Sequence, residues 1–227
     1  MLILASNSPR RRQLLTLAGW IYQTAPADID ESPLPGEDPR QYVLRLAREK
    51  ALVSAAAWSW PPGETGFVVA ADTTVALEGE ILAKPADPAE AAQMLLRLRG
   101  RAHQVYTGLA LLRSSDQALH LDLCATDVHM RAYSRSELDA YVQSGDPLDK
   151  AGAYAIQHAG FHPVDGLDGC YANVTGLPVC RLAALMQAWG RAPDRPAQVA
   201  CTGKAGMACA FCSYFDSLQP SIEGGVR

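Results

Sequence analysis

The sequence has no long hydrophobic run. Of its 227 residues, 48% are apolar, yet no apolar stretch approaches the roughly 20 residues that a membrane-spanning helix needs. The apolar run at residues 1–5 is short, and the arginines follow it instead of preceding it, which is not the pattern of a signal peptide. We therefore expect a soluble, cytoplasmic protein that has no membrane partner.

Charge is also sparse. Charged residues make up 19% of the chain, and the formal net charge is −4. This composition is typical of a packed globular core and argues against disorder, while the length suits one substantial domain or two small lobes. A net negative chain has no general attraction for nucleic acid, so any phosphate-binding site must be local.

Histidine and cysteine do not form a metal-binding pattern over most of the chain. Of the five histidines, only His158 and His162 have a spacing found among zinc ligands, and one such pair does not complete a site. Without a secretory pattern, six cysteines are weak evidence for disulfides. We expect Cys124, Cys170 and Cys180 to be buried thiols.

The composition changes after Trp189 to a segment rich in Gly, Pro and Arg. We expect residues 1–190 to form one domain and residues 191–227 to be a flexible C-terminal extension. The extension contains Cys201, Cys209 and Cys212. The last two have a spacing compatible with zinc or, more weakly, with an iron–sulfur loop, but no second pair lies nearby.

Capping residues and apolar runs predict an α/β fold. The strands and helices do not alternate regularly, so we expect a mixed, twisted sheet with flanking helices and two lobes around a central cleft. N-caps and N1 prolines predict helices that begin near Ser8, Asp38, Asp87, Ser134 and Pro178. Extended segments are predicted over residues 1–5, 67–71, 74–77, 81–82, 103–112 and 119–131.

The turn after the first predicted strand carries an unusual charge pattern. Ser8 and Pro9 specify a helix start, and three arginines occupy its first turn. The helix dipole is already positive at that end, so cations there are locally unfavourable. This conflict is resolved if Arg10 and Arg11 bind a polyanion together with the helix N-terminus. A solvated basic face is the alternative.

Two further residues stand where chemistry is expected. Asp72 follows the apolar run 67–71, and a carboxylate at the mouth of a buried strand is well placed for catalysis; the alternative is a turn residue. Lys50 lies on the apolar stripe of the helix that begins near Asp38. A lysine there either snorkels to the edge or points into a polar cleft. Lys84 and Lys150 are further candidates, although a single lysine is usually a surface charge.

Two polar residues complete the candidate set. Glu31 belongs to the acidic run 28–31 and could help to hold a divalent cation, although a solvated acidic loop is equally compatible. Gln157 ends a short apolar stretch, and its amide could bind the edge of a base.

Seven motifs occur in an order that resembles one known family. They are Ser6-Asn7-Ser8-Pro9-Arg10-Arg11, Ala47-Arg48-Glu49-Lys50-Ala51, Ala71-Asp72-Thr73-Thr74-Val75, Lys84-Pro85, His103-Gln104-Val105-Tyr106-Thr107-Gly108, the run 145–157, and Asn173-Val174-Thr175-Gly176-Leu177-Pro178. Over about residues 1–190 the chain resembles the Maf family of nucleoside triphosphate pyrophosphatases.

The resemblance implies hydrolysis of a nucleoside triphosphate to its monophosphate and pyrophosphate, with a divalent cation such as Mg or Mn. By position, Asp72 corresponds to the general base and Glu31 to an acidic partner near the metal and water. The triphosphate clamp corresponds to Ser8, Arg10, Arg11, Lys50 and Lys84, with Lys150 as a further substrate-binding residue. Arg10, Thr73 and Gln157 match positions associated with base choice.

The motif around residues 149–157 resembles the branch that acts on dTTP, UTP and modified pyrimidine nucleotides. The branch that acts on 7-methyl-GTP typically carries Glu where Gln157 stands. Two alternatives remain open at this stage: a 7-methyl-GTP pyrophosphatase, and a nucleotide-sensing regulator of septum formation. A homodimer is compatible with the sequence, which does not fix the oligomeric state.

Overall fold

A single mixed sheet of seven strands organises the protein. In the computed structural model, which describes residues 1–193, 195 and 197, the strands follow the order β2-β1-β3-β5-β6-β7, and β4 pairs with β3. Only the pairs β1–β2 and β1–β3 are parallel. The strands are β1 (Leu2–Leu4), β2 (Gln23–Thr24), β3 (Phe67–Leu77), β4 (Glu80–Leu82), β5 (Ala102–Arg113), β6 (Leu119–Met130) and β7 (Val164–Asp168).

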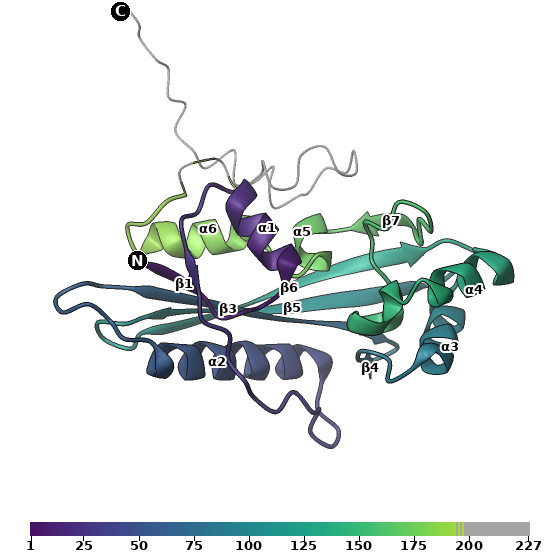
Figure 1. Cartoon of the computed structure of the whole chain (residues 1–227), viewed down its shortest axis with the longest axis horizontal. Helices are drawn as coiled ribbons and strands as arrows, with labels where there is room; N and C mark the ends of the chain where they lie inside the picture. Colours follow the sequence, from purple (N-terminus) through teal and green to yellow (C-terminus); the bar gives the residue numbers. More distant parts are fainter. Residues whose placement is uncertain (194, 196, 198–227) are drawn as a thin grey trace, which may run out of the picture.

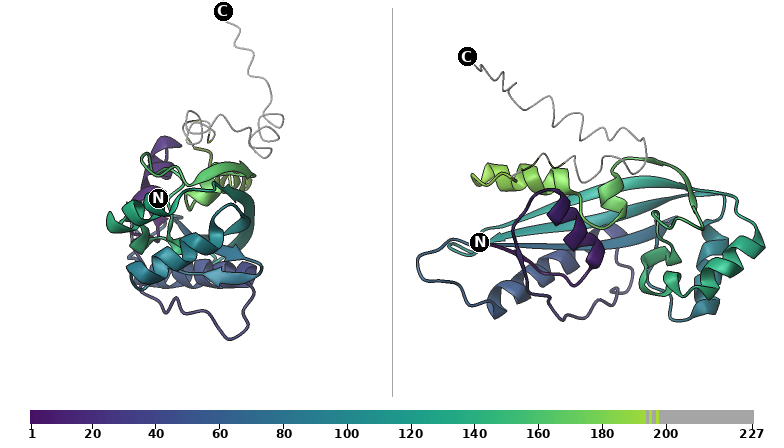
Figure 2. Two further views of the ribbon diagram at one scale, coloured as in Figure 1. Left: turned by 90° about the vertical axis from the view of Figure 1, so that its right-hand side faces the viewer. Right: turned by 45° about the horizontal axis from the view of Figure 1, so that its top comes forward.

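Helices cover both faces and one end of this sheet (Figures 1 and 2). Helix α2 lies along one face, α1 and α6 lie on the opposite face, and α3 and α4 lie together at the far end beside β4. The mixed α/β architecture that the sequence predicts is therefore confirmed. The helices are α1 (Pro9–Leu17), α2 (Pro39–Ala57), α3 (Pro88–Leu98), α4 (Arg135–Gln143), α5 (Tyr171–Val174) and α6 (Val179–Ala188).

The predicted caps explain where the main helices begin. Ser8, Asp38, Asp87 and Ser134 each accept a hydrogen bond from a backbone N–H of the helix that follows, and Ser134 forms a complete capping box with Glu137. The hairpin turn between β3 and β4 uses Glu78 and Gly79, both with positive φ. The sequence did not predict β2, β7, α5 or the two 3₁₀ turns at Asp146–Asp149 and Ala151–Ala153, all of which are short.

One strand prediction was wrong. Residues 67–71 and 74–77 are not separate strands, and Asp72 does not end a strand: it lies in the middle of β3. The reason is the long antiparallel pairing with β5, which runs without a break from Phe67–Arg113 to Ala76–Gln104. Asp72 is opposite Gly108 in this register.

The other edge of β3 explains why Asp72, although buried, nevertheless lines a cavity. On that side the parallel partner β1 stops at Leu4, which pairs with Val69, and β4 begins its pairing only at Val75. In the part of the chain that the structure describes, no strand lies beside the backbone between these two partners. This interruption, which we call the sheet gap, places residues 72–74 beside open space in the middle of the molecule.

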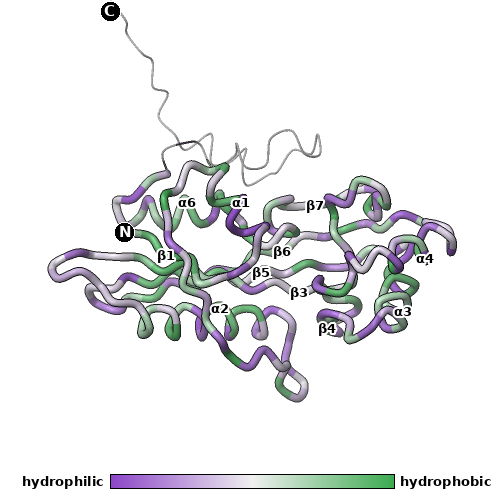
Figure 3. Tube along the Cα trace, in the orientation of Figure 1, coloured by the Kyte–Doolittle hydropathy of each residue, from purple (hydrophilic) through white to green (hydrophobic). Residues whose placement is uncertain are grey.

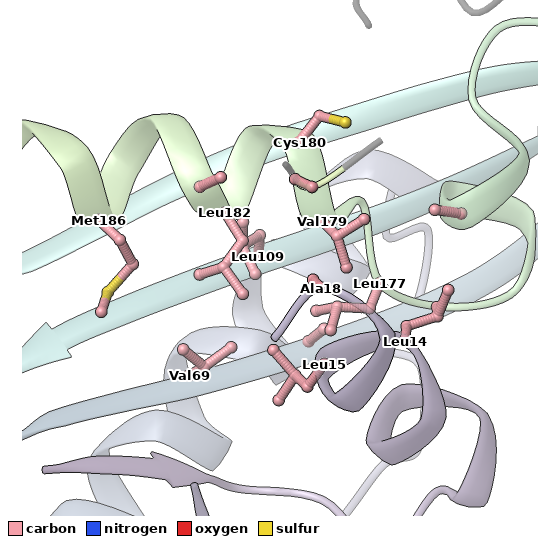
Figure 4. Packing of buried hydrophobic residues seen from close by; sticks show 14 of the residues in the cluster. Leu14, Leu15, Ala18, Val69, Leu109, Leu177, Val179, Cys180, Leu182 and Met186 are labelled. Atoms are coloured by element: carbon pink, nitrogen blue, oxygen red, sulfur yellow. The ribbon is translucent and has the colours of Figure 1, made fainter. Parts of the chain in front are cut away.

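The hydrophobic core is divided on the two sides of this gap. At one end, apolar residues of α1, α6 and the sheet pack on one face, as Figure 4 shows for Leu15, Leu109 and Met186, while residues of α2 pack on the other. At the far end, α3 and α4 form a separate cluster around Tyr133 and Leu95. The two predicted lobes therefore share one continuous sheet. In Figure 3, β1 is hydrophobic and the first turn of α1 hydrophilic.

The cysteine prediction is confirmed for the three that lie in the described part of the chain: Cys124, Cys170 and Cys180 are buried and form no disulfide. Cys201, Cys209 and Cys212 lie outside the described residues, as does most of the predicted 191–227 extension. Among the described residues, no helix has the length and apolar character to cross a membrane.

Gly108 allows α2 to lie directly on the sheet. A Cβ at this position would lie 2.3 Å from the carbonyl oxygen of Val43 in α2, and a backbone atom cannot turn away as a side chain can. We expect Gly108→Ala to lower the free energy of unfolding by about 1–3 kcal/mol through overpacking, and to lower activity because α2 carries Lys50. Thermal melts and turnover measure both effects. Gly166→Ala is the matched control, because a Cβ there has no atom within 4 Å; equal stability of the two variants would contradict the prediction.

Candidate active site

The sheet gap opens into a cavity of about 610 Å³. Its lining comes from the turn after β1, the loop before α2, the middle of β3, the end of β4 and the segments 149–157 and 174–176. Sites for small ligands commonly have volumes of about 300–1,000 Å³. All ten residues that the sequence singles out line this one cavity: Ser8, Arg10, Arg11, Glu31, Lys50, Asp72, Thr73, Lys84, Lys150 and Gln157.

Lys50 joins two carboxylates at the floor of the cavity. Its Nζ lies 2.6 Å from Asp72 Oδ1 and 2.6 Å from Glu31 Oε1. The buried face of α2 includes Val43, Leu46 and Lys50, as the sequence predicts, so the lysine must point at the sheet. Of the two outcomes foreseen for it, Lys50 points into the cleft and does not snorkel. Because an ammonium has three donors, two carboxylates leave it one donor.

Successive side chains of β3 point to opposite faces of the sheet. Val68 and Ala70 contact the α2 side, so Asp72 projects to that side as well. Val69 and Ala71 pack on the α1 side, so Thr73 projects toward α1. One strand thereby delivers a carboxylate to Lys50 and a hydroxyl to Arg11 at adjacent positions.

The pKa values of the two carboxylates are shifted in opposite directions. Burial raises the pKa of Asp72 above its ordinary value, and the charges of Lys50 and Arg11 only partly oppose this. Burial also acts to raise the pKa of Glu31, but there the hydrogen bond and charge of Lys50 prevail and the pKa is lowered. Glu31 has the more exposed side chain, 46% against 9% for Asp72. Paired carboxylates whose pKa values are driven apart are typical of acid–base chemistry.

Arg11 is held in the wall of the cavity by three acceptors. Its Nε donates to the Gly176 carbonyl at 2.8 Å, and its two terminal nitrogens donate to Ser6 Oγ and Thr73 Oγ1. Burial lowers its pKa. The Thr73 hydroxyl contacts a second group besides Arg11: it lies 2.8 Å from Thr107 Oγ1. The Thr107 hydroxyl in turn donates to the Asn173 carbonyl.

Arg10 and Lys84 are the cations that remain available. Within the part of the chain that the structure describes, neither forms a hydrogen bond or an ion pair, and both line the cavity. Ser8 Oγ caps α1 by accepting from Arg11 N at 3.4 Å, so the N-terminus of α1 also faces this space. A helix N-terminus beside two unpaired cations is suited to bind phosphate groups.

Lys150 and Gln157 lie on a different wall. Lys150 is buried, and its Nζ contacts three oxygens: the carbonyl and Oδ1 of Asp146 and Oδ1 of Asp149. These contacts occupy all three of its donors. Gln157 is exposed at the cavity rim. The substrate-binding roles of both residues stay predictions.

Sequence reasoning missed two tyrosines that line the cavity, Tyr42 and Tyr154. The Tyr42 hydroxyl donates to the Glu31 carbonyl at 2.8 Å and thereby holds the acidic loop over Lys50. Burial, with the nearby Asp72 and Glu31 carboxylates, raises its pKa to about 12, so the phenol stays a donor. A signal was present for Tyr42, which shares the buried helix face of Lys50 eight residues away.

These features define a class of protein: an α/β protein with a cationic cavity in the gap of a mixed sheet, built to take a polyanion beside a buried carboxylate. Residues 1–189 match the family model described as Maf-like protein. The chain belongs to the Maf family, as the sequence motifs indicated.

Several similar proteins carry a functional name. A protein from Myxococcus xanthus named dTTP/UTP pyrophosphatase is 50% identical over 190 residues, which cover 84% of this chain and 93% of the relative. Proteins of the same name from Anaeromyxobacter dehalogenans and Geobacter sulfurreducens are 48% and 43% identical, over 83% and 80% of this chain and 94% and 92% of their own.

Proposed function

We propose that this protein hydrolyses dTTP, UTP and modified pyrimidine nucleoside triphosphates to the monophosphate and pyrophosphate. The observation that carries the proposal is the pair of 2.6 Å contacts from Lys50 to Asp72 and Glu31, inside a cavity with unpaired cations. The relatives named dTTP/UTP pyrophosphatase support dTTP and UTP as substrates. We infer a cytoplasmic enzyme, since its substrates are metabolites of that compartment.

In this proposal, phosphate binding and water activation are performed by different residues. Arg10, Lys84 and the free donor of Lys50 bind the triphosphate, and the N-terminus of α1 adds backbone N–H groups. Arg11 keeps the turn between β1 and α1 in place through its contacts to Gly176 and Thr73. Hydrolysis of a phosphoanhydride depends mainly on such positioning and on charge stabilisation.

Asp72 accepts a proton from the attacking water. Water attacks the α-phosphorus, the bond to the bridging oxygen breaks, and pyrophosphate leaves with that oxygen. A raised pKa makes Asp72 a stronger base than an ordinary aspartate, which suits this transfer. Glu31 stays ionised and keeps Lys50 in position.

The carboxylates also fit a divalent cation. Among the residues that the structure describes, no three His, Cys, Asp or Glu side chains gather into a complete metal site. Magnesium commonly uses one or two carboxylates and takes its remaining ligands from water and substrate phosphates. Asp72 and Glu31 would be those protein ligands for Mg or Mn, and the cation would offset phosphate charge.

Gln157 is the residue that we expect to govern base choice. An amide both donates and accepts, whereas an ionised Glu only accepts. We expect Gln157→Glu to lower the ratio of kcat/KM for dTTP to kcat/KM for 7-methyl-GTP by about tenfold, the effect of one mismatched hydrogen bond. Steady-state kinetics with both nucleotides measure it. Gln187→Glu, exposed on α6, is the control, and an unchanged ratio would place base choice elsewhere in the cavity.

The direct test is pyrophosphate release from a panel of nucleotides. The purified protein is incubated with dTTP, UTP, a modified pyrimidine triphosphate, 7-methyl-GTP and the other common triphosphates, with Mg or Mn and with a chelator. We expect release from the pyrimidines, and loss of turnover with the chelator. Preferential release from 7-methyl-GTP, or tight binding without turnover, would refute the proposal in favour of the corresponding alternative.

A further inference from the structure

One wall of the cavity contains neither an α-helix nor a β-strand. Residues 149–151 and 154–157 belong to the cavity lining, within a segment from residue 146 to residue 157 that we call the wall segment. It contains two 3₁₀ turns, and both Gly152 and Ala153 have positive φ. A backbone of this kind lacks a continuous ladder of hydrogen bonds. Besides the hydrogen bond from the Gly152 N–H to the Ala83 carbonyl at 3.2 Å, side chains therefore fix its position.

Tyr141 of α4 holds the two ends of this segment together. Its hydroxyl donates to Asp146 Oδ2 at 2.7 Å and accepts from the backbone N–H of Ala155 at 3.1 Å. The tyrosine is 3% exposed, and its ring stacks on Phe161 with centroids 4.3 Å apart. Burial and the Asp146 carboxylate raise its pKa, so the hydroxyl keeps its proton.

Two further sets of contacts stabilise the same segment, one within it and one from β5. The three acceptors of Lys150 all come from Asp146 and Asp149, at the start of the segment. His103 of β5, which is fully buried, lies with Nε2 2.8 Å from the Tyr154 hydroxyl. Burial lowers the pKa of His103 to about 4, so this contact is made by a neutral ring.

From these contacts we propose that Tyr141 is a positioning residue that sets substrate affinity and base preference by fixing the wall segment, although it does not line the cavity. This inference rests on the proposed function. Ala155 follows Tyr154 and precedes Gln157 by two residues, so its N–H lies at the part of the wall that carries the base-choosing amide. Lys50, Asp72 and Glu31 belong to other elements and are left in place when Tyr141 changes.

The experiment compares Tyr141→Phe with Tyr133→Phe. Both tyrosines are buried in the same core cluster, both contact Phe161, and each hydroxyl donates one hydrogen bond. The Tyr133 hydroxyl donates to the Leu95 carbonyl in α3, which is not part of the wall segment. The two substitutions therefore remove the same hydroxyl group from the same core, but only Tyr141→Phe removes hydrogen bonds to the wall segment.

We expect Tyr141→Phe to raise KM for dTTP by about five- to tenfold, the effect of one net hydrogen bond, and to lower the dTTP preference over 7-methyl-GTP. Its kcat should stay within about twofold of the unchanged protein. Tyr133→Phe should lower Tm and leave KM and the preference unchanged. Equal KM shifts in the two variants, or no shift in either, would overturn the inference.

The proposed activity and the positioning role of Tyr141 can be refuted independently of each other. If the unchanged protein releases no pyrophosphate from any nucleotide, the activity is refuted whatever the variants do. The positioning role is then judged by calorimetry with the α,β-imido analogue of dTTP. A weaker Kd in Tyr141→Phe but not in Tyr133→Phe supports it, and equal Kd values overturn it.

Discussion

Asp72→Asn is expected to lower kcat by about 10²–10⁴-fold, the usual contribution of a general base, while the protein still binds dTTP. The amide has the shape of the carboxylate and can accept the Lys50 hydrogen bond, but it cannot take a proton from water. Pyrophosphate release under saturating dTTP measures the loss, and calorimetry with the α,β-imido analogue measures the retained affinity.

A thermal melt of Asp72→Asn shows whether its lower kcat comes from lost chemistry or from unfolding. A buried acid whose native pKa is raised binds its proton more tightly in the native state, so native stability is lost as pH rises through that pKa. At neutral pH the unchanged protein carries this cost and the Asn variant does not. We therefore expect Asp72→Asn to melt no lower than the unchanged protein. Asp127→Asn, exposed on β6 of the same sheet, is the activity control. Full activity of Asp72→Asn would remove Asp72 from the mechanism.

The long elements could be predicted from the sequence because their signals are local. Asp38 and Pro39 fix the start of α2, and the spacing of its apolar residues fixes which face is buried. The division of β3 into two strands was wrong for a non-local reason. Asp72 looks like a turn residue after an apolar run, but β5 supplies an antiparallel partner along nearly the whole strand.

The candidate site could be found from the sequence, whereas its contacts could not. The ten candidate residues line the same cavity because β1 ends early beside β3, which is a property of strand pairing and not of any one motif. The sequence offers no means to tell that Lys150 uses its donors on Asp146 and Asp149, whereas the Lys84 side chain has no hydrogen-bond or ion-pair partner among the described residues. That distinction depends on burial, which the residue type alone does not report.

Lys50→Met is the second change with a large expected effect. It removes the charge that joins Asp72 to Glu31 and keeps most of the side-chain volume. Because Asp72 and Lys50 are more than nine-tenths buried, an unpaired carboxylate there costs about 3–5 kcal/mol when ionised. We expect a lower free energy of unfolding at neutral pH and a kcat reduced by about 10²–10³-fold through the loss of charge stabilisation.

The pKa of Asp72 determines in which direction the pH dependence of activity and stability changes in Lys50→Met. Lys50 is the largest influence that lowers the pKa of Asp72, so its removal raises that pKa further. Activity requires the ionised carboxylate, and the acidic limb of kcat/KM must therefore move to higher pH in Lys50→Met. The stability deficit should shrink as pH falls, because protonation of Asp72 relieves the unpaired charge. Steady-state kinetics and thermal melts across the pH range measure both; an acidic limb at its original pH would contradict the coupling.

A double variant separates the electrostatic role of Lys50 from its packing role. In Lys50→Met with Asp72→Asn, no ionised carboxylate remains buried beside the methionine, so most of the lost stability should return although activity does not. Recovery of stability would show that Lys50 stabilises the protein by neutralising the buried charge of Asp72, the carboxylate that the reaction needs. If the double variant is instead as unstable as the two single effects added, the lysine stabilises the fold by its contacts with α2 and β3, and its link to Asp72 is incidental.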